Sequence, residues 1–200
     1  MKKTLFALIA GATLALAGAA HAGVTNFDEL NTAGDFASLT DINPYAGLTW
    51  GADWYAGDTG IDGYANGAHS GAHFAINGFG ADPADISSAS AFNFAGAWFA
   101  APVGVADKAT WVNISAYDAS NQLIGSTGNV AIGAGPVWVG GGFSNVSRLS
   151  ITRDTGWYAM DDFTTSTATS VAAPVPEPGT PLMLALGLLT LVAARRRSAR

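Results

Sequence analysis

The sequence predicts an all-β fold, a single antiparallel β-sandwich, and three observations support this prediction. The central part of the chain is rich in Gly, Ala, Ser, Thr, Asn and aromatic residues, and no segment shows the 3.6-residue spacing of an amphipathic helix. Short runs with alternating or aromatic-rich patterns recur along it. Clusters of Gly, Asn, Asp and Pro separate these runs, which is typical of many short strands joined by turns.

We expect eight or nine strands in a body that spans residues 23–164. A Gly, Asp and Asn loop is expected at 57–71 and turns are expected at Asn43-Pro44, at 82–85 and at 118–121. The runs that read as strands, taken in order, are 24–30, the aromatic part of 42–54, 73–79, 91–99, 110–117, 122–126, 137–139, 146–152 and 157–164.

Two of these runs alternate clearly enough to predict which side chains face the core. In 110–117 the apolar positions form one face, and in 146–152 Leu149 and Ile151 point inward. Phe92 and Phe94 share a face in the same way. The remaining predictions place Val112, Ile114 and Ala116 inside, and Arg148, Ser150 and Thr152 toward water.

The N-terminus has the pattern of a signal peptide. Lys2 and Lys3 precede an apolar core at 4–19, and Ala20-His21-Ala22 is an A-x-A cleavage site. We therefore expect residues 1–22 to direct export through the Sec machinery and to be removed by signal peptidase after Ala22. An uncleaved N-terminal anchor is the alternative, but the core is short and rich in Ala and Gly.

The body between the two ends is acidic. Fourteen acidic residues stand against Lys108, Arg148 and Arg153, which gives a net charge of −11. A body with three cations cannot neutralise a run of phosphates, so the charge disfavours nucleic acid and anionic membrane surfaces as partners and favours divalent cations or neutral glycans. The chain has no cysteine, so an exported body gains no disulfide.

The C-terminus has three ordered elements after a Ser, Thr and Ala-rich spacer at 165–174. A Val175-Pro176-Glu177-Pro178 box opens the segment 175–180, an apolar stretch follows at 181–194, and Arg195, Arg196 and Arg197 begin a basic end at 195–200. Pro181 falls in the first turn of the predicted helix, where its missing N–H costs nothing. Residues 175–200 resemble the PEP-CTERM sorting signal.

The resemblance implies a route for the protein. An exosortase in the inner membrane of a Gram-negative bacterium that makes exopolysaccharide would process the chain at or near the box, and the body would pass to the cell surface or the medium. The apolar stretch extends about 20–24 Å as a helix, short of the roughly 30 Å hydrocarbon core. The arginines are expected to stay cytoplasmic as a membrane stop. A plain C-terminal anchor without cleavage is the alternative.

The body resembles the jelly-roll β-sandwich domains that precede such tails, through Tyr45-Ala46-Gly47-Leu48-Thr49-Trp50 and the segment 156–163. This resemblance implies a structural calcium ion shared by the first and last strands, with Asp28 or Glu29 beside Asp161 as candidate ligands. Asp161 and Asp162 are adjacent on a predicted strand, so we expect their side chains to point to opposite faces. Hydrogen-bonded or solvated carboxylates without calcium are the alternative.

The aromatic residues divide between core and surface. Most of them are expected in the core. The candidates for an exposed platform that stacks on sugar rings, as in carbohydrate-binding modules, are Trp54, Tyr55 and Tyr64, which lie near the polar loop. His69 and His73 have the spacing of a helical zinc pair, but their segment is predicted to run from loop into strand, which would separate them.

No catalytic arrangement is found in the sequence. The chain has no G-x-S-x-G elbow and no cysteine nucleophile, and Glu29 is the only glutamate of the body. We therefore expect a non-enzymatic, exported surface or matrix protein with a structural, adhesive or glycan-binding role. A secreted polysaccharide-processing enzyme that uses aspartates is the alternative.

Overall fold

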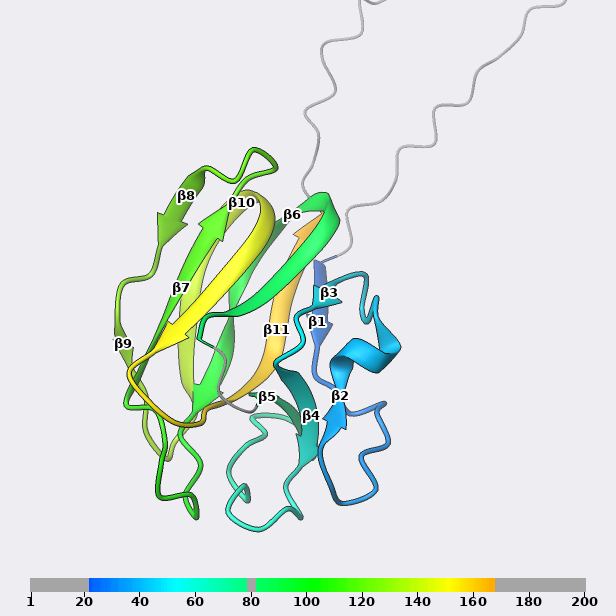
Figure 1. Ribbon diagram of the computed structural model, residues 1–200, viewed down its shortest axis with the longest axis vertical. Coiled ribbons are helices and arrows are strands. Elements are labelled where there is room, and N and C mark those ends of the chain that lie inside the picture. Colours follow the sequence, from blue (N-terminus) through cyan, green and yellow to red (C-terminus); the bar gives the residue numbers. More distant parts are fainter. Residues whose placement is uncertain (1–21, 79–81, 168–200) are drawn as a thin grey trace, which may run out of the picture. The chain divides into compact units, whose positions relative to one another are not determined.

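The protein was analysed as a computed structural model that describes residues 22–78 and 82–167. These residues form eleven strands and one short 3-10 helix (Figure 1). In chain order the elements are β1 (Ala22–Thr25), β2 (Ala37–Ser38), η1 (Leu39–Ile42), β3 (Thr49–Trp50), β4 (Trp54–Asp58), β5 (His73–Asn77), β6 (Ala84–Ala100), β7 (Trp111–Tyr117), β8 (Leu123–Ser126), β9 (Val130–Ala131), β10 (Val137–Arg153) and β11 (Ala159–Thr167).

All strand pairs are antiparallel and they join into one sheet. The order is β2-β4-β5-β11-β6-β10-β7-β8, while β1 pairs with β11, β3 with β6 and β9 with β7. The long strands β6 and β10 pair along most of their length, with register shifts between Gly140 and Arg148. On one side of these shifts β6 pairs with β11, and on the other β10 pairs with β7. The predicted all-β antiparallel fold is confirmed.

Bulges allow the sheet to fold over a shared core. Inward side chains of the β7 half contact those of the β11 half in one buried cluster, and the curvature of β6 and β10 between the halves is visible in Figure 1. The alternation predicted for β7 is confirmed because Val112, Ile114 and Ala116 are buried. Leu149 and Ile151 are also buried as predicted, but Ser150 is 6% exposed and does not face water.

Several predicted boundaries were wrong. The turn expected at 82–85 gives way to β6 at Ala84, and the runs 137–139 and 146–152 belong to the single strand β10, whose bulges accommodate the intervening glycines. The expected loop at 57–71 begins after Asp58, and β5 starts at His73 as predicted. The predicted first strand, 24–30, is confined to β1, and Phe27 adopts a positive φ of 63° directly after it.

The last strand extends beyond the predicted end of the body at residue 164. Strand β11 continues to Thr167, so the first three residues of the predicted spacer pair with β6 and β1 instead. Polar residues can extend an antiparallel strand because backbone groups form the ladder. The predicted signal-peptide core, sorting box, apolar stretch and arginine cluster lie outside the described residues, and of the predicted cleavage motif only Ala22, the first residue of β1, is described. Within residues 22–78 and 82–167, no helix has the length and apolarity needed to cross a membrane.

Candidate functional site

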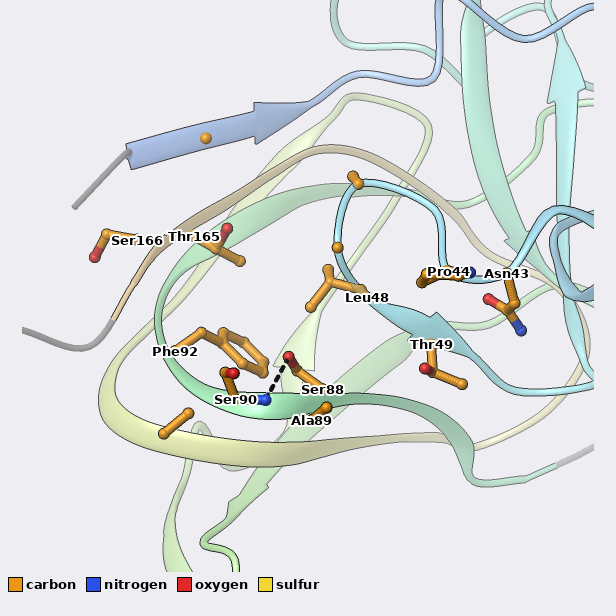
Figure 2. A pocket seen from close by; sticks show the side chains of 14 residues that line it. Asn43, Pro44, Leu48, Thr49, Ser88, Ala89, Ser90, Phe92, Thr165 and Ser166 are labelled. Atoms are coloured by element: carbon orange, nitrogen blue, oxygen red, sulfur yellow. Dashed lines mark hydrogen bonds between the residues drawn. The ribbon is translucent and has the colours of Figure 1, made fainter. Parts of the chain in front are cut away.

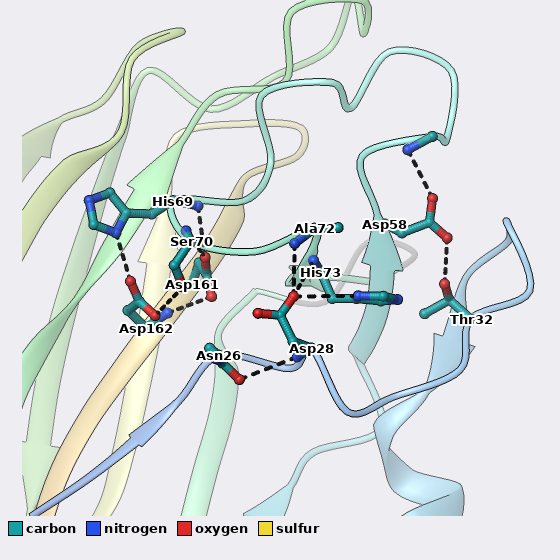
Figure 3. A network of polar contacts seen from close by, with 11 residues as sticks. Asn26, Asp28, Thr32, Asp58, His69, Ser70, Ala72, His73, Asp161 and Asp162 are labelled. Carbon is teal, nitrogen blue, oxygen red and sulfur yellow. Dashed lines mark hydrogen bonds and ion pairs between the residues drawn. The ribbon is translucent and has the colours of Figure 1, made fainter.

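The loop between β4 and β5 is held against the body by three aspartates (Figure 3). Asp161, on β11, is 1% exposed, and its Oδ2 accepts hydrogen bonds from the backbone N–H groups of His69 at 2.7 Å and Ser70 at 2.8 Å. Its Oδ1 accepts the N–H of Asp162 at 2.7 Å. One buried carboxyl group therefore satisfies three backbone donors.

Asp162 binds the same two loop residues through their side chains. Its Oδ2 lies 2.6 Å from His69 Nδ1, and its Oδ1 accepts a hydrogen bond from Ser70 Oγ at 2.7 Å. The prediction that Asp161 and Asp162 point to opposite faces was wrong. A register shift in the pairing with β6 follows Asp161, and Asp162 adopts a φ of 49°, so the regular alternation is interrupted and both carboxylates reach one loop.

Asp28 holds the end of the same loop. Its Oδ1 accepts hydrogen bonds from the N–H groups of Ala72 at 2.8 Å and His73 at 3.0 Å, and His73 Nδ1 lies 3.5 Å away. Burial tends to raise the pKa of Asp28, but the donors of Ala72 and His73 outweigh burial and hold the pKa below its ordinary value. Asp28 is thus an anionic anchor for the start of β5.

The candidate calcium ligands do not form one cluster. Asp28 and Asp161 bind different residues of the loop, whereas Glu29 is exposed and acts on Tyr45, whose pKa is raised by burial first and then by the Glu29 charge. In the described ranges no group of three or more His, Asp or Glu side chains is arranged to hold a metal ion. Calcium at Asp28, Glu29 and Asp161 stays a prediction. His69 and His73 pair with separate aspartates, Asp162 and Asp28.

The pKa of Asp161 leads to a pH prediction. Burial, reinforced by the charge of Asp162, raises this pKa to about 6, although the N–H donors of Ser70, Asp162 and His69 oppose the rise. A raised pKa in the folded state contributes stability below pH 4 that is lost as the pH rises through 6. Between pH 4.5 and pH 7, urea unfolding should show wild type losing about 1–2 kcal/mol relative to Asp161→Asn. A constant difference between the two proteins would contradict this pKa.

Two of the three predicted platform residues are in the core. Trp54 is 0% exposed and Tyr64 is 6% exposed, so neither ring has a face open to a sugar, and these two predictions were wrong. The indole of Trp54 packs edge-on against Trp50, and its Nε1 donates to the carbonyl of Asp85 at 3.0 Å. Tyr64 stacks on Phe74 at 5.8 Å. Tyr55 is half-buried beside Gly78, where an added Cβ would lie 2.4 Å from its ring.

An exposed aromatic cluster occurs elsewhere, where Trp138 of β10 pairs with Trp98 of β6. Trp138 is 40% exposed, and the two indole centroids lie 5.7 Å apart at 62°. On the far side of Trp98 the imidazole of His69 stacks at 3.9 Å and 7°. Because Asp162 holds His69 through Nδ1, the aspartates that anchor the loop also fix this row of three rings, which we name the aromatic row.

The indole of Trp138 lies over two glycines of the sheet, where no side chain separates it from the backbone. A Cβ added at Gly96 would be 2.5 Å from its Cζ2 atom, and one added at Gly140 would be 2.8 Å from its Nε1 atom. The two glycines face each other across β6 and β10. One side of the indole is therefore seated on the sheet, and the exposed part of the ring is presented to solvent.

Sequence reasoning missed the aromatic row because its members are distant in the chain and proximity to a polar loop was used as the guide. A usable signal was present, since both Trp98 and Trp138 lie two residues from a glycine on the same strand, at Gly96 and Gly140. Glycine within a strand often marks a close approach of another group. Here that group is the indole of Trp138.

A separate hollow of about 720 Å³ lies between the β3 turn, β6 and the end of β11 (Figure 2). Its lining is mainly small residues and backbone, with Leu48 and Phe92 as the large apolar side chains. Polar side chains here are neutral, and Ser90 N–H donates to Ser88 Oγ at 3.3 Å. No ionisable side chain lines this hollow, so it offers no acid, base or ionic group.

Comparisons with known proteins give a sequence match at the C-terminus and remote structural similarity for the body. Residues 174–197 match the family described as the PEP-CTERM protein-sorting motif. No curated protein matches the chain. A DUF4465 family protein from Bacteroides caccae has 13% identity and a TM-score of 0.42, with 56% of this chain and 72% of that chain covered.

Two xylanase-derived structures are comparably remote. The N-terminal CBM22 tandem domain of Paenibacillus barcinonensis Xyn10C has 14% identity and a TM-score of 0.42, over 82% of this chain and 49% of that one. The CBM22-1-GH10 modules of Clostridium thermocellum endo-1,4-beta-D-xylanase 10B, complexed with xylohexaose, have 14% identity and a TM-score of 0.41, over 72% and 28%. The chain thus combines an antiparallel all-β body with a PEP-CTERM protein-sorting motif at residues 174–197.

Proposed function

We propose that this protein is exported, processed by an exosortase, and displayed at the cell surface or in the extracellular matrix, where its body binds a glycan. The observation that carries the binding role is the aromatic row, with Trp138 exposed on a glycine floor and Trp98 and His69 held beside it. A flat exposed indole with neighbouring polar groups is suited to stack on the apolar face of a sugar ring.

The anchoring of the row supports binding by a preformed surface. His69 is stacked on Trp98 and bonded to Asp162, while the adjacent N–H groups are bonded to Asp161. When a ligand binds rings that are already held in place, less conformational entropy is lost than when binding must order mobile side chains. The acidic charge of the body directs the proposal toward neutral glycans, the host exopolysaccharide included.

Binding is tested with the secreted body against a panel of neutral polysaccharides and the host's own exopolysaccharide. We expect Trp138→Ala to weaken binding by roughly 30-fold, because removal of a central tryptophan commonly costs about 2 kcal/mol at a binding surface. Trp111→Ala is the matched control, since this half-buried tryptophan lies on β7 and outside the row. Equal weakening by both variants would point to general destabilisation and reject the platform.

Gly140→Ala tests the seating of the ring while the tryptophan is retained. The new methyl group would lie 2.8 Å from Trp138 Nε1, so the indole must move off the floor. We expect an intermediate loss of affinity, and unchanged affinity would show that the orientation of the ring is unimportant.

Processing is tested on the same chain by mass spectrometry of the C-terminus. In cells that contain the exosortase, the mature protein should lack Arg195, Arg196 and Arg197, and substitution of the box residues Pro176, Glu177 and Pro178 should leave them attached. A full-length C-terminus in the unsubstituted protein would reject processing and favour a plain membrane anchor. Signal peptidase cleavage after Ala22 is read in the same spectra.

The alternative of a polysaccharide-processing enzyme is distinguished by product analysis. An enzyme would release oligosaccharides from the polymer that it binds, whereas the proposed binding protein would leave the polymer length unchanged. The carboxyl group of Asp161 accepts three backbone hydrogen bonds, which is an anchoring role.

A further inference from the structure

The outward face of the sheet continues beyond the aromatic row along β11, β6 and β10. At the row, Trp98 of β6 pairs with Trp138 of β10 and with Asp161 of β11. The next paired set is Gly140, Gly96 and Thr164. Because paired residues of antiparallel strands point to the same face, the two glycines lie on the outward face, where the indole of Trp138 covers them.

A hollow of about 230 Å³ lies farther along the same strands, and both polar residues and apolar ones such as Phe94 and Phe143 line it. Asn93 is central: its Nδ2 donates to Ser166 Oγ at 3.4 Å, and its Oδ1 accepts the N–H of Asn145 at 3.2 Å. Ser144 is exposed at its rim, and Thr164 links the hollow to the row by donating to the carbonyl of Asp162 at 2.9 Å. The lining contains no ionisable side chain.

The spacing of these features decides how many sugar units the face accommodates. Trp98 and Asn93 are five residues apart on β6, which corresponds to roughly 16 Å of strand. This length exceeds one pyranose ring several-fold. The indole platform, which is seated on Gly96 and Gly140, and the Asn93 hollow therefore form two separate places along one line.

We infer that this line is a track for an extended, neutral glycan chain, which lies along β6 with one unit over Trp138, another in the Asn93 hollow, and the intervening units between these two places. The inference rests on the proposed glycan-binding function and specifies its ligand as several consecutive units of a chain. Trp138 then supplies stacking to the glycan, and Asn93 and Ser144 in the hollow supply polar contacts.

The charges around the track favour a neutral chain. Asp161 and Asp162 flank its aromatic end, and the body carries fourteen acidic residues. The cations of the described body are Lys108, Arg148 and Arg153. Arg148 lies over the ring of Tyr117 on β7 and pairs with Asp85, and Arg153 pairs with Asp82 at 3.9 Å. None of the three lines the hollow, so a polyuronate would meet repulsion without a compensating cation.

The test is a length series measured by calorimetry with the full body. Neutral β-linked gluco-, xylo- and manno-oligosaccharides of two to six units serve as probes, with oligouronates as the charged comparison. For the series that binds, we expect affinity to rise about tenfold or more between two and six units, and oligouronates to bind at least tenfold more weakly than neutral chains of equal length.

Substitutions inside and outside the hollow test where the gain in affinity with chain length arises. Ser144→Trp, which fills the hollow from its exposed rim, should abolish the gain in affinity with chain length. Ser120→Trp, on the exposed β7–β8 turn, is the matched control and should keep the gain. Asn93→Ala should reduce the gain in part without adding bulk.

The outcomes separate the two proposals. Equal affinity for short and long chains, or a gain that survives Ser144→Trp, would overturn the track while a Trp138-dependent affinity upheld the glycan-binding function. Stronger binding of oligouronates would overturn the neutral ligand class. If no oligosaccharide or polysaccharide bound to the wild-type body, both the track and the proposed function would be rejected.

Discussion

Replacing Trp54 by alanine is expected to destabilise the body by about 3–5 kcal/mol, the usual cost of truncating a buried tryptophan. Trp54 is fully buried, its ring lies 5.5 Å from Trp50 and 6.0 Å from Tyr158, and its Nε1 donates to Asp85. The change removes all of these contacts and leaves a cavity. Urea unfolding followed by circular dichroism measures the loss.

Trp54→Phe provides the control for size and hydrogen bonding. Phenylalanine retains much of the apolar contact but cannot donate to Asp85, so its cost should fall clearly below that of alanine. A Trp54→Ala protein of wild-type stability that had lost glycan affinity would contradict the core position and restore Trp54 as a platform residue. We expect the opposite result: Trp54→Ala loses stability, and any loss of glycan affinity is a consequence of that loss.

The contrast between Trp54 and Trp138 shows what composition could and could not predict. Both tryptophans lie near the start of a strand and close to glycines, so their local sequences are similar in kind. Trp54 lies on β4, whose outer neighbour is β2. The ring of Trp54 points into the core beneath β3 and β6. Trp138 is on the outward face opposite Gly96. The pairing partners that decide this come from distant parts of the chain.

Alternation was a reliable guide where strands are regular. The buried positions of β7 follow from its sequence, since Val112, Ile114 and Ala116 occupy every second place. The side chains of the opposite face are half-buried. The same reasoning failed at Ser150 because it is buried between β6 and β7, where its backbone pairs on both sides. Period two specifies the face of a side chain but not whether a neighbouring element covers that face.

The loop anchors were the hardest feature to foresee. Asp161 and Asp162 were recognised as special, but a regular strand was assumed, and the positive φ of Asp162 has no clear sequence signal in an aspartate. Their partners, His69 and Ser70, are more than 90 residues away in the chain. Sequence identified the chemical groups, while the bulge and the long-range contact decided what they do.

Replacing Asp161 by alanine is expected to cost about 3 kcal/mol and to lower the melting temperature by roughly 6–12 °C. The substitution deprives three backbone N–H groups, those of His69, Ser70 and Asp162, of their acceptor in a place that water barely reaches. Buried donors without a partner carry the full desolvation penalty, so the loop should detach. Amide hydrogen exchange at residues 69 and 70 reports this detachment directly.

Asp162→Ala separates the buried anchor from the ion pair beside it. Asp162 binds the His69 and Ser70 side chains and is 15% exposed, so its loss should cost only about 1 kcal/mol and leave the two backbone amides protected by Asp161. Both variants should loosen the stacking of His69 on Trp98, and glycan affinity should fall in both. Protected amides at 69 and 70 in Asp161→Ala would show that the loop is held by other contacts. Since the aromatic row shares those residues with the anchor, the stability of the loop and the readiness of the binding surface are set by the same two aspartates.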